Sequence, residues 1–251
     1  TGIVVIGGLK RIAEVASYLV PFMGSVYFGA MLIAILLNLE LVLPAFKLIF
    51  VDAFNGTAVA GGTFIGVLIY GVRRGAFSNE AGMGTESLVH GVAKVSNPVK
   101  QGLVAMTGPI FDTLIICTAT ALIILISGVW ETSTSQGVTL TSEAFNLLLG
   151  DLGGFILFAC VICFGLSTIF TYSYYGASCA RFIFGSFGMN FYIYLYIIGI
   201  FIYSILPIDI AINIADGAFA MMAIPTLISA LWLAPKVMQE SRNYFKLVDN
   251  I

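Results

Sequence analysis

A run of polar residues interrupts an otherwise apolar stretch in the first third of the chain. The segment Phe77–Thr85 reads FSNEAGMGT and follows two adjacent arginines, Arg73 and Arg74. Glycine is a poor helix former, and Ser and Asn side chains compete for backbone hydrogen bonds, so this composition favours unwound backbone. Helix ends at such a break present partial charges that bind carboxylates and cations. We call residues 77–85 the polar island.

Two interpretations of the polar island are open. It is either a loop at the inner side of a membrane, capped by the two arginines after a complete span over Gly56–Gly75, or a break within a spanning helix. Unwound backbone inside a bilayer is tolerated only where it lines a cavity or is buried in protein. Arg73, Arg74, Asn79 and Glu80 lie within eight residues. Ionisable groups are rare in membranes unless they serve a site or pair, which favours the break.

Two further polar groups lie in apolar segments. Asp112 and Thr113 interrupt PIFDTLIICTAT, where the carboxylate is either a sodium or proton ligand or a salt-bridge partner of one of the two arginines. Ser167 and Thr168 begin a row of hydroxyls in FGLSTIFTYSYYG. That row is either an oxygen shell for Na⁺ or a set of hydroxyls bonded to their own helix or to a neighbouring one.

The remaining candidates are isolated. His90 lies near Lys94, where we expect it to be solvated, and Asp216 is expected to face a cavity or to pair with another span. Cys160 and Cys163 have CxxC spacing, but in an apolar helix we interpret them as small buried side chains, without a metal or disulfide. No Walker loop supports ATP-driven chemistry.

The composition places these groups in a membrane. Of 251 residues, 59% are hydrophobic and 10% are charged, whereas a soluble domain has about 25% charged residues. The net charge of −2 argues against nucleic acid as a partner. We therefore predict an all-α integral membrane protein. After the tail of a helix at Thr1–Gly8, spans are expected over Ala16–Asn38, about Thr57–Val95 with the interruption, Leu103–Val129, Gly153–Ala180, Phe191–Leu206 and Ile208–Leu233.

The linkers are short, so residues 1–251 are expected to form a single transmembrane domain. Basic residues concentrate on one side of the alternating spans, which predicts a cytoplasmic tail over about residues 235–251. The segment Trp130–Asp151 is then external and long enough to be a lid. The chain begins inside an apolar segment, without an initiator methionine or a signal peptide, and we expect a fragment.

Four stretches together resemble the alanine/glycine:cation symporter family, the sodium-coupled alanine carriers. FSNEAG and DTLIICT are the most specific strings among them. The stretches are GGLKRIAEVASYLVPFM (7–23), RGAFSNEAGMGT (74–85), NPVKQGLVAMTGPIFDTLIICTATALIIL (97–125) and FGLSTIFTYSYYG (164–176). The resemblance covers essentially the whole chain, which aligns with about the C-terminal half of a family member.

The resemblance implies a LeuT-like fold of two inverted repeats, of which this chain would hold the second repeat plus the preceding helix. It implies sodium-coupled symport of alanine or glycine by alternating access in the plasma (inner) membrane, with the lipid bilayer and a missing N-terminal half of the same protein as partners. The chain would not be an enzyme. The alternative is a proton-coupled amino-acid carrier of the same fold, with Asp112 or Glu80 as the proton site.

The resemblance also implies the roles of individual residues. Two departures leave the preferred substrate side chain open: Tyr172 stands where the family usually has Trp, and Met83 and Thr85 stand where Leu and Ser are common. Carried over by position, the substrate-binding residues are Asn79, Gly82, Met83, Gly84, Thr85 and Tyr172. The sodium ligands are Ser167 and Thr168, and Asp112 and Thr113 approach the same site.

Overall fold

The computed structural model describes residues 8–54 and 63–248, and every element within these ranges is helical. Most of the helix tail predicted at Thr1–Gly8 and the start of the predicted third span lie outside the described residues. Four helical segments of the described part are long and apolar enough to cross a bilayer: Glu14–Leu37, Pro98–Ser127, Asp151–Ile205 and Ile210–Leu247. They confirm the prediction of an all-α integral membrane protein.

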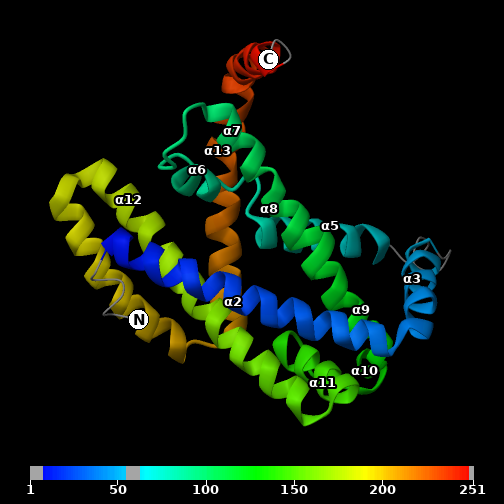
Figure 1. Ribbon diagram of the computed structural model, residues 1–251. Coiled ribbons are helices and arrows are strands. Elements are labelled where there is room, and N and C mark those ends of the chain that lie inside the picture. Colours follow the sequence, from blue (N-terminus) through cyan, green and yellow to red (C-terminus); the bar gives the residue numbers. More distant parts are fainter. Residues whose placement is uncertain (1–7, 55–62, 249–251) are drawn as a thin grey trace. The chain divides into compact units, whose positions relative to one another are not determined.

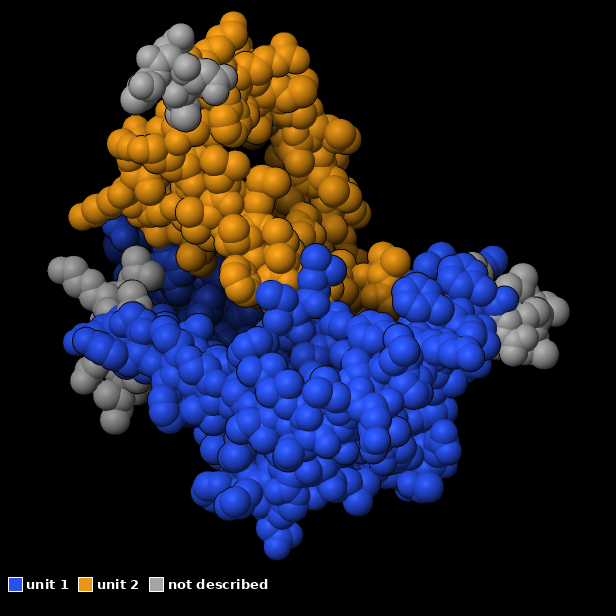
Figure 2. Space-filling view, turned by 45° about the vertical axis from the view of Figure 1, so that its right-hand side comes forward, with its two compact units in different colours: residues 1–68, 114–197 blue, residues 69–113, 198–251 orange. Residues whose placement is uncertain are grey.

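The helices follow one another with short connections (Figure 1). In chain order they are α2 (Gly8–Leu37), α3 (Leu39–Ala53), α5 (Thr63–Asn79), α6 (Thr85–His90), α7 (Pro98–Ala105), α8 (Thr107–Pro109), the π-helix η1 (Ile110–Cys117), α9 (Thr118–Ser127), α10 (Val129–Thr132), α11 (Val138–Leu149), α12 (Asp151–Ile205) and α13 (Ile208–Val248). The chain forms two compact units, coloured separately in Figure 2: unit 1 contains residues 1–68 and 114–197, and unit 2 contains residues 69–113 and 198–251.

Unit 1 has a tightly packed core between α2, α9, α11 and α12. Met31, Ile123 and Phe145 are completely buried there. The ring of Tyr27 stacks on Phe145 with 5.8 Å between centroids, and its hydroxyl lies 2.8 Å from Thr120 Oγ1. A buried phenol needs such a partner, so this hydrogen bond lets a polar group sit among apolar side chains.

Helix α3 is an element that the sequence analysis did not predict. Its 15 residues are too few to cross a bilayer, which requires about 20 apolar residues, so the length criterion for a span does not identify this helix. The helix places Ala45 against Leu122 and Ile126 of α9, while Leu43 on its other side is exposed. The apolar residues within LELVLPAFKLIFVDA are the signal that could have identified it.

The predicted external segment Trp130–Asp151 has regular secondary structure. Most of it is helical, as α10 and α11, and α11 buries Ala144 and Phe145 in the core of unit 1. Gly128, Gly137 and Gly150 all have positive φ at the ends of these helices, conformations that glycine adopts without strain. Two buried side chains in one short helix fix this segment to the unit.

Helix α12 contains both of the spans predicted at Gly153–Ala180 and Phe191–Leu206. Gly185 separates them, because its φ of 69° and ψ of −158° are not helical. Large apolar side chains on this helix and on α13 are exposed, among them Phe182 at 93% and Trp232 at 82%. Exposed apolar surface of this extent is expected of helices that face lipid.

In unit 2, α13 packs along α7 and is the longest element of that unit. Its 41 residues correspond to about 60 Å, twice the thickness of about 30 Å of the hydrocarbon core of a bilayer. The residues expected to form a tail from about 235 continue the helix as far as Val248. Part of α13 therefore extends beyond the apolar layer.

Candidate functional site

The polar island is a helix break, centred on residues 80–84. Helix α5 ends at Asn79, whose Oδ1 accepts a hydrogen bond from the backbone N–H of Ala81 at 3.0 Å. Glu80, Gly82 and Gly84 then have positive φ values of 55°, 79° and 91°. A positive φ is uncommon for glutamate and costs energy, and such strain collects at functional sites.

The second half of the interrupted span is shorter than predicted. Helix α6 ends at His90, whereas the sequence predicted a span to Val95, and residues 91–97 are not helical. His90 is half-buried, and its Nδ1 lies 2.7 Å from Gln101 Nε2 on α7. His90 was expected to be solvated, and the structure shows it partly exposed with one polar partner on α7.

Gly84 lies against the side chain of Thr226 on α13. A Cβ at this position would lie 2.5 Å from Thr226 Oγ1, closer than van der Waals contact allows. At Gly82 the nearest atom to such a Cβ is Leu227 Cδ2 at 3.9 Å, so there the requirement for glycine comes from φ alone. The break therefore packs on α13 through its glycines.

Asp112 and Thr113 lie beside the end of α5. Ser78 Oγ donates to Asp112 Oδ2 at 2.6 Å, and Asn79 Nδ2 donates to Thr113 Oγ1 at 3.3 Å. Thr113 Oγ1 in turn donates to Asp112 Oδ2 at 3.3 Å. Both residues belong to the π-helix, a rare element that occurs frequently at functional sites. The structure thus brings four polar side chains of unit 2 together next to the break.

The arginines before the island pair with a different carboxylate from the one considered in the sequence. Arg73 Nη2 and Arg74 Nη2 both contact Asp216 Oδ2 of α13, the second at 2.9 Å. A salt bridge from Asp112 to either arginine is therefore wrong, whereas the alternative that Asp216 pairs with another helix is confirmed. The sequence contained all three ionisable residues but gave no signal of how they pair.

Two other predicted residues lie at the break. Thr85, the first residue of α6, is 1% exposed, and its hydroxyl has no hydrogen-bond partner among the described residues. An unpaired buried hydroxyl costs about 1–3 kcal/mol, and a ligand at the break could relieve this cost. Met83 lines a cavity of about 400 Å³, bounded otherwise by residues of α5 and α13.

The predicted sodium ligands and Tyr172 belong to unit 1. Ser167 is buried and its Oγ donates to the carbonyl of Phe164 at 2.9 Å, while Thr168 is exposed. Tyr172 is half-buried, with 5.3 Å between its ring centroid and that of Tyr175. The hydroxyl of Ser167 is thus bonded to its own helix, as one of the two interpretations of the row expected.

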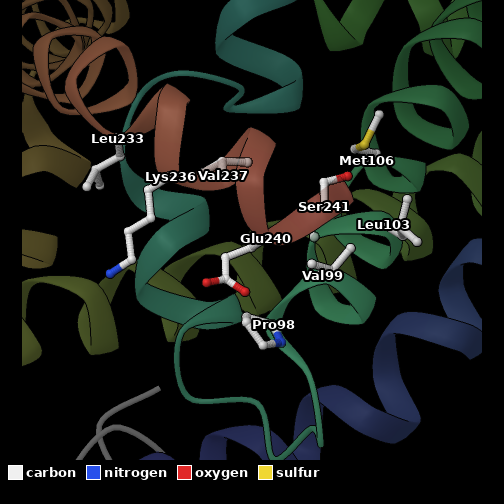
Figure 3. Close-up of a pocket in the computed structure, with 10 residues that line it drawn as sticks. Pro98, Val99, Leu103, Met106, Leu233, Lys236, Val237, Glu240 and Ser241 are labelled. Carbon is white, nitrogen blue, oxygen red and sulfur yellow. The ribbon is translucent and has the colours of Figure 1, made fainter. Parts of the chain in front are cut away.

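A second cavity in unit 2, of about 580 Å³, lies between α7 and the C-terminal part of α13 (Figure 3). Lys236 and Glu240 are its charged residues, and most of its other lining side chains, such as Leu103 and Met106, are apolar. It shares no lining residue with the break or with the Asp216 pair. For this reason we do not assign it to the candidate site.

Long apolar helices, with a strained break that gathers a carboxylate, an amide and hydroxyls, are typical of a multi-pass membrane transporter. The chain belongs to the sodium:alanine symporter family, because the model of that family matches residues 1–250. The family consists of transporters and not of enzymes, and the protein is a multi-pass protein of the plasma membrane.

Three relatives illustrate the similarity. An uncharacterized transporter of Haemophilus influenzae is 36% identical over 98% of this chain and 55% of its own length. The sodium/alanine symporter AgcS of Methanococcus maripaludis is 34% identical over 100% of this chain and 56% of its own length. A sodium/proton-dependent alanine carrier protein of Bacillus sp. (strain PS3) is 34% identical over 69% of this chain and 42% of its own length.

The chain spans about half the length of the curated relatives it matches. The missing N-terminal half of the same protein stays a prediction. The membrane as the environment agrees with the family and with the long apolar helices.

Proposed function

We propose that the protein carries out sodium-coupled symport of a small neutral amino acid, alanine or glycine, by alternating access in a LeuT-like fold. The observation that carries the proposal is the break at residues 80–84, in a chain of the sodium:alanine symporter family. A break with three positive-φ residues and few side chains leaves backbone dipoles available to an amino acid.

The amino acid binds at the break in this proposal. Backbone N–H groups of the glycine-rich turn meet its carboxylate, and Thr85 and Asn79 supply side-chain hydrogen bonds. Met83 meets the substrate side chain, and a contact of Tyr172 with the substrate stays a prediction. The unpartnered hydroxyl of Thr85 supports this assignment, because buried polar groups are nearly always hydrogen-bonded.

Sodium is bound by the hydroxyls of Ser167 and Thr168, with Asp112 and Thr113 as the further candidates. The hydrogen bond from Ser167 Oγ to Phe164 uses only the proton of the hydroxyl. Its oxygen lone pairs remain able to coordinate a hard cation, so bonding to its own helix and sodium ligation are compatible.

Sodium coupling is tested by uptake of labelled alanine into liposomes that contain the protein. We expect uptake with an inward Na⁺ gradient and none when choline replaces Na⁺. Thr168→Ala should raise the Na⁺ concentration for half-maximal uptake about tenfold, the cost of one lost ligand of about 1.4 kcal/mol. Thr107→Ala is the control, because within the part of the chain that the structure describes Thr107 Oγ1 bonds only the carbonyl of Val104. Equal uptake in Na⁺ and choline would contradict the proposal.

Proton coupling is the second candidate function, and Asp112 is the residue that decides it. This carboxylate accepts hydrogen bonds from Ser78 and Thr113, and the relative from strain PS3 is described as sodium/proton-dependent. We expect Asp112→Asn to raise the Na⁺ requirement about tenfold. A pH gradient without Na⁺ should drive no uptake. Uptake driven by the pH gradient alone, and lost in Asp112→Asn, would establish the proton-coupled alternative instead.

A further inference from the structure

Two arginines and one aspartate form a charge cluster between α5 and α13. The Asp216 side chain is 2% exposed, whereas the side chains of Arg73 and Arg74 are 49% and 36% exposed. Both guanidinium groups contact the same carboxylate oxygen, Oδ2. With two positive charges and one negative charge, the cluster keeps a net charge of +1, which disfavours a bare cation as its ligand.

The second oxygen of the Asp216 carboxylate, Oδ1, forms no hydrogen bond within the described residues. Asp216 Oδ1 is buried and has no hydrogen-bond partner within residues 8–54 and 63–248. A buried carboxylate oxygen without a hydrogen-bond donor destabilises the fold. This cost is larger for an ionised group than for a neutral polar group. Arg73 pairs through Nη2, and a guanidinium carries five N–H donors, so donors of this residue remain for a ligand.

A cavity of about 400 Å³ lies at this cluster, and Arg73, Asp216 and Asn213 are its polar lining residues. Its remaining walls are apolar: Val72, Ala76, Phe77, Met83, Gly217, Phe219 and Ala220. Rotation about χ2 is soft in aspartate, so a small rotation can turn Oδ1 toward a ligand in this space. The cavity therefore offers a cation, an anion and an amide next to apolar surface.

These groups fit a zwitterion better than a simple ion. Arg73 can meet a carboxylate through two N–H donors, and the free oxygen of Asp216 can accept from an ammonium group. The apolar walls, with Phe77 and Phe219 at 4.5 Å between ring centroids, suit a short aliphatic side chain. A halide would leave the free carboxylate oxygen unpaired, and Na⁺ would be repelled by the net positive charge.

We infer that this cavity is a second binding site for the transported amino acid, separate from the break, with Arg73 on its carboxylate and Asp216 on its ammonium group. The inference rests on the proposed amino-acid transport. Met83 lines the cavity and is also part of the break, so an amino acid bound here would lie next to the first site.

The test is equilibrium binding of labelled alanine to the purified protein in lipid nanodiscs with Na⁺. The wild type should bind two alanines per chain. Gly217→Leu adds bulk at the wall of the cavity and leaves its charged residues in place, and a Cβ at Gly217 meets no atom within 4 Å. This variant should bind one. Gly199→Leu is the matched control, because Gly199 is equally open but lines neither cavity of unit 2, and it should still bind two.

A charge variant and two analogues test the chemistry. Asp216→Asn keeps the shape and should weaken the second site about tenfold or more. Propionate, which lacks the amine, and ethylamine, which lacks the carboxylate, should not displace alanine from it. Displacement by propionate or chloride alone would make this an anion site, and displacement by Na⁺ alone would make it a cation site. Either result overturns the inference.

Different results would contradict the second site and the site at the break. Asn79→Ala should weaken the site at the break and leave the cavity occupied. If Gly217→Leu still binds two alanines, the second site does not exist while transport by the break stands. The wild type could instead bind one alanine, with binding abolished by Gly217→Leu and unchanged by Asn79→Ala. In that case the cavity binds the amino acid, and the assignment of a site to the break is wrong.

Discussion

At Gly84, two independent constraints meet in one residue. Its φ of 91° is strained for any L side chain, and a Cβ would collide with Thr226 Oγ1 at 2.5 Å. We expect Gly84→Ala to lower the free energy of unfolding by about 1–3 kcal/mol. The measurement is thermal unfolding of the purified protein in detergent.

Gly71→Ala is the matched control for this substitution. Gly71 lies within α5, and a Cβ there meets no atom within 4 Å. Alanine in a helix interior should stabilise it by about 0.5–1 kcal/mol. Equal effects of the two substitutions would show that the backbone at Gly84 is not constrained as described.

The helix break could be predicted from the sequence, but the pairing of the charged residues beside it could not. A break was expected from the glycines and Asn79, since these residues act on their own backbone. The pairing of Arg73 and Arg74 with Asp216 depends on which helices approach each other, and a carboxylate on either α13 or η1 would satisfy an arginine equally well. Residue types alone therefore could not decide between Asp216 and Asp112.

At the scale of single elements, Phe145 is the larger of the two side chains that α11 buries in the core of unit 1. Phe145 is completely buried and stacks on Tyr27 of α2. Phe145→Ala should cost about 3–5 kcal/mol, through lost contacts and the cavity left behind. Leu147→Ala on the same helix is the control, because Leu147 is 65% exposed and should change stability by less than about 0.5 kcal/mol.

The measurement for α11 is amide hydrogen exchange of residues 138–149. Faster exchange in Phe145→Ala, but not in Leu147→Ala, would identify local opening of this helix. If both variants exchange like the wild type, α11 is stabilised by other contacts.

We also expect α11 to be sensitive to pH, through the contact of Glu143 with the serines that precede the helix. Hydrogen bonds from Ser133, and then from Ser135 at 2.6 Å, lower the pKa of Glu143 below its ordinary value. A lowered folded-state pKa stabilises the fold at pH values above the unfolded pKa, and this contribution is lost as the pH falls through the lowered value. Protection of α11 against hydrogen exchange should therefore decrease in acid.

Ser135→Ala should bring the pKa of Glu143 back toward its ordinary value and reduce this acid sensitivity. Thr141→Ala is the control, because its hydroxyl donates to the carbonyl of Gly137 and not to Glu143. The pKa of Glu143, followed by carboxyl NMR, should rise in the first variant only. No change in either would contradict the role of Ser135.

Long elements were predicted more successfully than short ones. A run of about 20 apolar residues leaves few alternatives to a spanning helix, which explains the agreement at α2 and α12. Helices α3 and α11 are shorter, and packing against α9 decides their conformation. The π-helix Ile110–Cys117 has no signal in its composition, since IFDTLIIC suits an α-helix equally well.

At the scale of the whole molecule, the distribution of basic residues predicts how the protein is inserted. Lys236, Arg242 and Lys246 lie near the C-terminus, and basic residues favour the cytoplasmic side. A fluorescent protein fused after Ile251 should be fluorescent in cells, and alkaline phosphatase at the same place should be inactive. Phosphatase fused after Gly137 should be active, and the reverse pattern would show the opposite orientation.

A proline within α13 allows the two ends of this helix to move relative to each other. Pro225 lies inside it, and a proline removes one backbone hydrogen bond and allows a helix to bend. Asp216 lies nine residues before this point and Ser241 sixteen after it, distances of about 13 and 24 Å along the axis. A tilt of about 10° at Pro225 would move Ser241 by on the order of 4 Å. A bend of α13 at Pro225 would therefore move the wall of the larger cavity relative to the charge cluster.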